Sequence, residues 1–158
     1  MVREPVLAYV ALGANLGDAQ AAVRHALAAL DQDLPETHRV AASALYRSAP
    51  IDAQGPPFVN AVAALSTRLP APVLLAELQR LERLAGRERP YHHAPRTLDL
   101  DLLLYGDGRI DSPALTLPHP RMVDRAFVLL PLAEIAPQRV DRARLAELAH
   151  QSIERIGS

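Results

Sequence analysis

The chain has 158 residues and no cysteine, so it is long enough to bury roughly 70 % of its unfolded surface in one core, and it cannot use thiol nucleophiles, iron–sulfur clusters or cysteine zinc sites. A net charge of −1 argues against general nucleic-acid binding, and no apolar run approaches the ~18 residues of a membrane span. We therefore expect one domain over residues 1–158 in the cytoplasm, with neither nucleic acid nor membrane as a partner. We also expect it to act as a monomer on small molecules.

The N-terminal part predicts three strands and a helix. A buried strand is expected over residues 6–12, closed by a turn at 13–17, and Asp18 suits the N-cap of a helix. The apolar face of that helix has spacings of three and four and consists of Val23, Ala26, Leu27 and Leu30. Two further strands are expected at about 40–46 and 58–69.

A second helix and a buried strand follow. Pro72 suits the first turn of the helix and Gly86 its C-terminal cap. The apolar stripe between them consists of Leu74, Leu75, Leu78, Leu81 and Ala85. The next strand is expected over residues 97–105, with a turn at 106–108 leading into a short strand near 109–110.

Two helical patterns, at roughly 121–135 and 141–155, complete the chain. The predicted order of strands and helices is that of a ferredoxin-like split βαβ arrangement. The expected fold class is therefore α+β, a sandwich of helices layered on a mainly antiparallel sheet.

The stretch "TLDLDLLLY" places two aspartates two positions apart on a strand. Successive side chains alternate between faces, so Asp99 and Asp101 share one face, while Leu98, Leu100 and Leu102 share the other. Like charges about 7 Å apart repel unless a cation compensates. Mg²⁺ commonly takes one or two carboxylates together with substrate phosphates, so this face is a candidate magnesium site.

The positions of the arginines add to this pattern, although their total reflects composition, since all 17 basic residues are arginine. Arg87, Arg89 and Arg96 lie past the helix-ending glycine, in a loop that leads to the aspartates. Guanidinium groups beside magnesium carboxylates form a constellation suited to phosphoryl transfer. His119, between two prolines, and Arg125 are candidates for the same anion, although a histidine in such a turn is more often structural.

Two other features leave alternatives open. Glu82 falls within the apolar stripe of the second helix, either at its edge or facing a ligand. The Pro/Gly-rich segment 48–57 is either a binding loop or an ordinary surface loop. The chain has no Walker-type phosphate loop, no Ser/His/Asp set and no HExxH motif.

The motifs "YVALGANLGD", "FVNAVAAL", "LERLAGRER", "PRTLDLDLLLYG" and "LPHPRMVDRAFVLLPLAEIAP" together resemble the 6-hydroxymethyl-7,8-dihydropterin pyrophosphokinase family of folate biosynthesis. The resemblance implies transfer of pyrophosphate from the co-substrate ATP to the pterin hydroxymethyl group, with release of AMP. It also implies that two Mg²⁺ ions bind Asp99 and Asp101, and that Arg87 and Arg96 act with them in catalysis.

The resemblance implies ligand contacts for further residues. The ATP contacts carried over are Glu82, Arg87, Arg89, Arg96, Leu102, Thr116, His119 and Arg125. The pterin contacts are Ser48, Ala49, Ile51, Phe58, Asn60 and Phe127, with the two rings sandwiching the pterin. The chain departs from the family at Ser48-Ala49-Pro50, which replaces Thr-x-Pro, and which of Tyr91, His92 and His93 contacts ligand stays open.

Two other functions remain possible from the residues alone. A two-metal nucleotidyltransferase would also carry paired aspartates on a strand, but it would release pyrophosphate instead of AMP. A catalytically silent nucleotide-binding module would keep the fold without the chemistry. The joint presence of both aspartates, Arg96 and His119 argues against the silent module.

Overall fold

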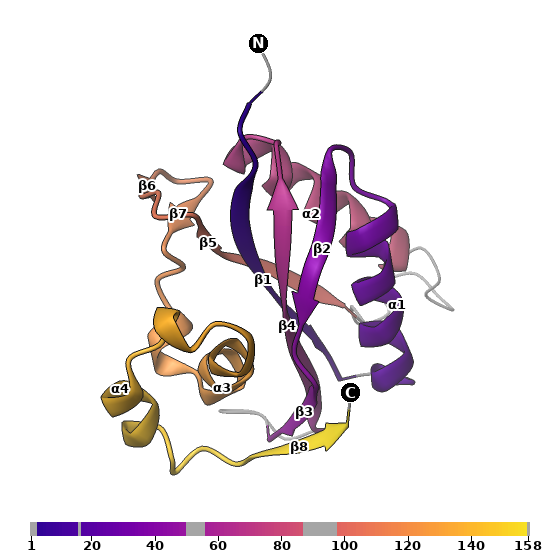
Figure 1. Ribbon diagram of the computed structural model, residues 1–158. Helices are drawn as coiled ribbons and strands as arrows, with labels where there is room; N and C mark the ends of the chain where they lie inside the picture. The colour runs from indigo at the N-terminus through magenta and orange to yellow at the C-terminus, as the bar shows by residue number, and fades with distance from the viewer. Residues whose placement is uncertain (1–2, 16, 50–55, 87–97, 158) are drawn as a thin grey trace.

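The computed structural model describes residues 3–15, 17–49, 56–86 and 98–157 (Figure 1). Within these residues, helices cover both faces of a central sheet, and no helix has the length and apolar character needed to cross a membrane.

Six strands form the main sheet of the described chain, and every pairing in it is antiparallel. The strand order is β5-β1-β4-β3-β8, and β2 also pairs with β4. The strands are β1 (Val6–Ala14), β2 (Thr37–Ala42), β3 (Leu45–Ser48), β4 (Phe58–Thr67), β5 (Asp99–Tyr105) and β8 (Ile153–Gly157). The predicted α+β class with a mainly antiparallel sheet is confirmed.

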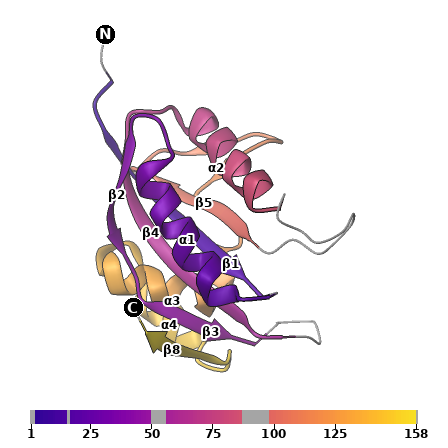
Figure 2. The ribbon, with the colours of Figure 1, turned by 90° about the vertical axis from the view of Figure 1, so that its right-hand side faces the viewer.

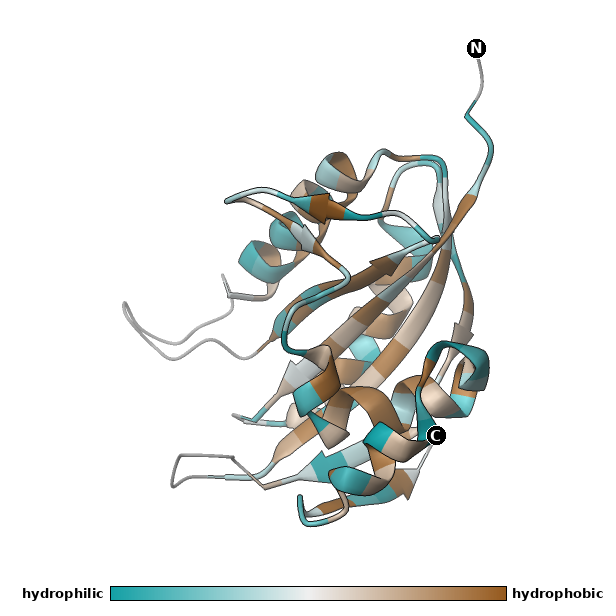
Figure 3. Cartoon of the chain, turned by 90° about the vertical axis from the view of Figure 1, so that its left-hand side faces the viewer, coloured by the Kyte–Doolittle hydropathy of each residue, from teal (hydrophilic) through white to brown (hydrophobic). Residues whose placement is uncertain are grey.

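The helices lie on opposite faces of this sheet (Figure 2). Helices α1 (Ala19–Gln32) and α2 (Ala71–Gly86) cover one face, where Leu12 and Leu100 join one buried cluster. Helix α3 (Ala126–Ile135) covers the other face, where Tyr9 and Val62 join a second cluster. Hydrophobic residues accordingly gather along the central strands (Figure 3).

Helix α1 follows its predicted pattern. The carboxylate of Asp18 caps it by accepting a hydrogen bond from the Ala21 N–H at 3.0 Å. The predicted apolar residues are buried: Val23, Ala26, Leu27 and Leu30. In α2, Leu74, Leu78 and Leu81 are buried as predicted, and Gly86 is its last residue.

The strand predicted at 40–46 is in fact two strands, β2 and β3. Ser43 separates them, because its hydroxyl accepts from the Val62 N–H at 3.0 Å and donates to the Ala44 carbonyl at 2.7 Å. The first strand extends further than predicted, because Gly13 and Ala14 pair with β4 instead of forming a turn.

The C-terminal region differs most from the prediction. The helix expected from residue 121 begins as a 3-10 turn, η1 (Met122–Asp124), before α3, and a second 3-10 turn, η2 (Pro137–Arg139), follows. The helix expected over 141–155 is wrong: α4 (Arg142–Glu147) is short, a turn follows it, and the chain then forms β8 from Ile153. Pairing with the edge of β3 satisfies backbone groups there and overrides the helical pattern.

A small second sheet lies beyond β5. The predicted strand near 109–110 corresponds to β6 (Ile110–Asp111), which pairs with β7 (Thr116–Leu117). Strand β7 was not predicted, because two residues carry too little periodicity to reveal a strand.

Helix α3 is tied to β3 by a partly buried polar contact. The Tyr46 hydroxyl donates to Glu134 Oε1 at 2.6 Å, and the Ala44 N–H donates to Glu134 Oε2 at 2.9 Å. Burial, together with the hydrogen bond to Glu134 and its negative charge, raises the pKa of Tyr46 to about 12.

This pKa predicts a loss of stability at alkaline pH. The unfolded phenol ionises near pH 10, whereas the folded one keeps its proton to about pH 12. The stabilisation is therefore complete below pH 10 and is lost as the pH rises towards 12. We expect the wild type to lose about 1 kcal/mol more unfolding free energy than Tyr46→Phe between pH 9 and pH 11, measured by urea titration. Equal slopes in the two proteins would contradict this prediction.

Candidate active site

The register of three strands brings the predicted polar residues together. Gly13 in β1 is opposite both Asp99 in β5 and Asn60 in β4, and Ala11 is opposite Asp101. Directly opposed residues of an antiparallel pair project from the same face. The two carboxylates and the amide therefore lie on the α3 side of the sheet, separated by residues with little or no side chain.

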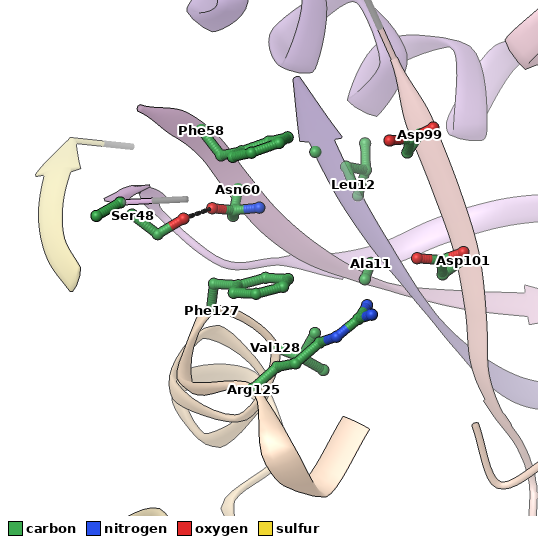
Figure 4. A pocket seen from close by; sticks show the side chains of 12 residues that line it. Ala11, Leu12, Ser48, Phe58, Asn60, Asp99, Asp101, Arg125, Phe127 and Val128 are labelled. Atoms are coloured by element: carbon green, nitrogen blue, oxygen red, sulfur yellow. Dashed lines mark hydrogen bonds between the residues drawn. The ribbon is translucent and has the colours of Figure 1, made fainter. Parts of the chain in front are cut away.

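A cavity of about 250 Å³ lies above this row (Figure 4). Strands β1, β4 and β5 form its floor, and the start of α3 forms a wall. Its lining residues are Ala11, Leu12, Gly13, Ser48, Ala49, Phe58, Asn60, Asp99, Asp101, Arg125, Phe127 and Val128. Eight of the predicted site residues thus share one cavity: Ser48, Ala49, Phe58, Asn60, Asp99, Asp101, Arg125 and Phe127.

Two aromatic rings stand on either side of Asn60 in this cavity. Phe58 comes from β4 and Phe127 from the first turn of α3, and both are half-buried. The Arg125 guanidinium carbon lies 5.4 Å from the centroid of the Phe127 ring. Rings in this arrangement favour a flat π-system between them, and a cation at the edge favours an anionic group beside it.

The amide of Asn60 has a fixed orientation. Asn60 and Ser48 are each 4 % exposed, and the Ser48 hydroxyl donates to Asn60 Oδ1 at 2.6 Å. The amide nitrogen points away from Ser48 (Figure 4), and a Cβ built on Gly13 would lie 3.2 Å from it. Glycine at position 13 therefore leaves the space in which Asn60 presents its N–H donors to the cavity.

The two aspartates lie on the face predicted for them. Leu100 and Leu102 point into the opposite core, which confirms the alternation expected for β5. On the outer edge of β5, Glu82 Oε2 accepts a hydrogen bond from the Leu100 N–H at 2.7 Å. Glu82 therefore fixes the main chain between Asp99 and Asp101, in addition to any role toward a ligand.

His119 is half-buried near these carboxylates. The main-chain N–H of His119 donates to the Leu103 carbonyl at 2.9 Å, and its ring Nδ1 accepts from the main-chain N–H of Arg121 at 3.2 Å. Burial lowers the pKa of His119, the Asp101 charge opposes this, and the Arg125 and Arg121 charges add to it. Because Nδ1 accepts from the main chain, the neutral form of the ring carries its proton on Nε2, where it can donate to an anion.

Several predicted residues lie elsewhere in the fold. Glu82, Thr116 and His119 are not among the residues lining the cavity, and Thr116 lies in β7. The side chain of Leu102 is 3 % exposed in the core behind the aspartates, so only its main chain can contact a ligand. Other predicted site residues lie outside the part of the chain that the structure describes: Ile51, Arg87, Arg89, Arg96, Tyr91, His92 and His93.

The sequence missed the small residues of the cavity floor. Ala11 and Gly13 both lie in β1 and line the cavity, whereas the sequence predicts a turn from Gly13 onward. Period-two alternation from Ala11 to Gly13 was the available signal, but it identifies a site only once the pairing with Asp99 and Asn60 is known. Leu12 and Val128 also line the cavity and were not predicted.

The donor set fits magnesium. Among the described residues, no three histidine, aspartate or glutamate side chains cluster as a metal site, so the candidate is the Asp99–Asp101 pair. Two carboxylates that face an open cavity fit Mg²⁺, which usually completes its coordination shell with waters and substrate phosphates. They are too few for a site in which the protein supplies every ligand.

Comparison with known proteins identifies relatives along almost the whole chain. The family model described as 7,8-dihydro-6-hydroxymethylpterin-pyrophosphokinase (HPPK) matches residues 9–137. A protein of Pseudomonas aeruginosa named 2-amino-4-hydroxy-6-hydroxymethyldihydropteridine pyrophosphokinase is 47 % identical over 155 residues, which cover 94 % of this chain and 95 % of that protein. Proteins of the same name from Haemophilus influenzae and Bacillus subtilis are 46 % and 38 % identical, covering 85 % and 93 % of this chain and 84 % and 88 % of those proteins.

The Ser48–Asn60 hydrogen bond predicts a coupled effect on stability. Ser48→Ala removes the donor to a buried amide oxygen, so we expect a loss of about 1–3 kcal/mol in unfolding free energy. Ser48→Ala combined with Asn60→Leu should cost less than the sum of the two single changes, because the second change removes the unsatisfied group. Denaturant titration of all four proteins gives the coupling energy, and additive effects would argue against this bond.

Proposed function

Because the chain belongs to the 7,8-dihydro-6-hydroxymethylpterin-pyrophosphokinase family, we propose that the cavity between Phe58, Phe127 and the β5 aspartates is its active site. The enzyme transfers pyrophosphate from ATP to 6-hydroxymethyl-7,8-dihydropterin in folate biosynthesis. One observation carries the assignment of the site: the strand register and the start of α3 together bring an amide between two aromatic rings at one end of the cavity and two carboxylates at the other.

The pterin ring fits the aromatic end of the cavity. Phe58 and Phe127 offer faces for a planar heterocycle, and Asn60 offers N–H donors to an acceptor on its edge. Ser48 supports this role by holding the Asn60 carbonyl oxygen. Ala49 lines the same end, and we extend the assignment to Ile51 by family resemblance.

The polyphosphate of ATP fits the other end. We infer that Asp99 and Asp101 hold Mg²⁺ there, two ions by family resemblance. Bound Mg²⁺ would supply positive charge that neutralises the phosphate oxygens. A rigid core strand, fixed at its outer edge by Glu82, keeps the two carboxylates in place without reorganisation.

A cationic side chain and a neutral donor lie near the two carboxylates. Arg125 points into the cavity between Phe127 and Asp101 (Figure 4), so it can grip the transferring group where the two substrates meet. Neutral His119 can donate from Nε2 to a phosphate oxygen. We assign further ATP contacts to Glu82, Leu102, Thr116, Arg87, Arg89 and Arg96, and charge stabilisation during transfer to Arg87 and Arg96.

In the reaction, the pterin hydroxymethyl oxygen forms a bond to the β-phosphorus while the bond from that phosphorus to the bridging oxygen of AMP breaks. The hydroxyl group gives up its proton to solvent. The described residues contribute position and charge: the two rings fix the pterin plane, Asn60 fixes its rotation, and Arg125 stabilises the charge of the transferring group.

We also propose a fold type, a domain organisation, an oligomeric state and a compartment for the protein. The strand order β5-β1-β4-β2, with both crossover helices on one face, supports the ferredoxin-like split βαβ assignment. We further propose that residues 1–158 form one domain that acts as a monomer in the cytoplasm. A chain without cysteine needs no disulfide, which suits a reducing compartment.

Loss of either aspartate is expected to abolish product formation. With ATP, Mg²⁺ and the hydroxymethyl pterin, the wild type should release AMP and a pterin diphosphate. Asp99→Asn and Asp101→Asn should lower kcat by roughly 10²-fold or more, as measured by chromatography of the nucleotides. Asp107→Asn is the matched control, because Asp107 follows the same strand but is fully exposed. Release of ADP or pyrophosphate, or wild-type activity in both variants, would refute the assignment.

The cavity floor should tolerate no methyl group at position 13. Gly13→Ala would place a Cβ 3.2 Å from the Asn60 amide nitrogen and displace the donors offered to the pterin. We expect the KM for the pterin to rise about tenfold, while the KM for ATP stays near that of the wild type. Urea unfolding serves as the control for folding. A rise confined to the KM for ATP would place the pterin elsewhere.

A further inference from the structure

Arg125 occupies a position where a helix normally carries a hydrogen-bond acceptor. It is the N-cap residue of α3, with φ −127° and ψ 110°, and its side chain makes no capping hydrogen bond to a described residue of the helix. A guanidinium has no acceptor, yet the first N–H groups of a helix need one. A residue that serves the ligand has therefore taken the place of a serine, threonine, aspartate or asparagine.

Gln151 supplies the missing acceptor from 25 residues further along the chain. Its Oε1 accepts from the Ala126 N–H at 2.9 Å, and its Nε2 donates to the Asp124 carbonyl at 2.9 Å. One amide group thus bonds the main chain on both sides of Arg125. Because these two bonds fix the peptide groups that flank Arg125, they fix the direction in which its side chain leaves the backbone.

Gln151 is itself anchored to the opposite wall of the active site. Ile153 pairs with Ser48 in the β3–β8 ladder, and the Ala49 N–H donates to the Ser152 carbonyl at 3.4 Å. The short segment 151–153 therefore spans from the strand end that holds Asn60, through Ser48, to the helix start that carries Phe127.

Among the described residues, packing leaves open space beside Phe127. A second cavity of about 270 Å³ lies on that side, and Ser48, Ala49 and Phe127 line both cavities. Gln151 lines the second one as well. With open space next to the ring, the position of Phe127 depends on its backbone, and therefore on the Ala126 N–H that Gln151 binds.

We propose that Gln151 is a positioning residue for the reaction: it caps α3 in place of Arg125 and so directs Arg125 and Phe127 toward the two substrates. This inference rests on the proposed function. The match to the family model ends at residue 137, so Gln151 lies in the part of the chain beyond that match.

Arg144 holds the turn just before this corner and does not replace Gln151. Its guanidinium donates to the Val123 carbonyl and to Asp124 Oδ1, each at 2.7 Å. Both of these acceptors precede Arg125. The N–H of Ala126, on the helix side, has Gln151 as its partner.

The test compares Gln151→Met, which keeps the length but loses both bonds, with Gln151→Glu, which keeps an acceptor for the Ala126 N–H. We expect the pterin KM to rise about tenfold in Gln151→Met and by less in Gln151→Glu, at a temperature where circular dichroism shows both fully folded. Glu154→Gln is the control, since it breaks only the exposed ion pair with Arg47 next to the same segment. If Gln151→Met does not fold, the pterin KM of Gln151→Glu is compared with that of Glu154→Gln, and a rise in Gln151→Glu alone supports the proposal.

The outcomes separate this inference from the proposed function. Phe127→Ala is measured alongside, and a wild-type pterin KM in that variant would refute the site itself. If Phe127→Ala weakens pterin binding but the Gln151 variants keep both the wild-type pterin KM and the wild-type kcat, only the role of Gln151 is overturned. A rise in pterin KM that follows the loss of the Ala126 bond, with no rise in Glu154→Gln, supports it.

Discussion

The strand register of β1, β4 and β5 is the constraint on which the rest of the structure depends. Gly13 faces Asp99 on one side and Asn60 on the other, and a slip by one residue would turn each of them into the core. The slip is prevented from the opposite face, where Leu12 and Leu100 are buried beneath α1 and α2. The apolar alternation that makes the core therefore also fixes how the two substrate ends of the cavity lie relative to each other.

Several residues of the site are poor choices for local structure, and the surroundings compensate for each. Glycine weakens a strand interior, yet Gly13 lies between two paired strands. Asn60 is almost fully buried, and the Ser48 hydroxyl satisfies its carbonyl oxygen. Arginine cannot cap a helix, and Gln151 does so in place of Arg125. These exceptions to local preference coincide with the surface of the cavity, which is where function would require them.

The parts that sequence could predict are those fixed by local chemistry. The buried strand with its two aspartates on one face, and the helix capped by Asp18, follow from period-two and period-3.6 patterns and were confirmed. Strand β8 could not be predicted, since its pairing partner on β3 lies about a hundred residues away. Gln151 had no signal either: its role exists only because the fold brings it to an arginine at a helix start. Both features depend on contacts between residues that are far apart in the sequence, and local patterns carry no signal for such contacts.

The wall and the floor of the cavity have different origins, and directional bonds set the distance between them. Leu129 and Leu132 press α3 onto the sheet, but apolar packing by itself permits sliding. Glu134 near the C-terminal end of α3 bonds Tyr46, the register partner of Asn60, and Gln151 bonds the N-terminal end. A helix bonded at one end to β3 and at the other to the segment before β8 cannot tilt without breaking a half-buried hydrogen bond. The apolar core thus provides the adhesion, and these two polar anchors provide the alignment that a reaction between two bound substrates requires.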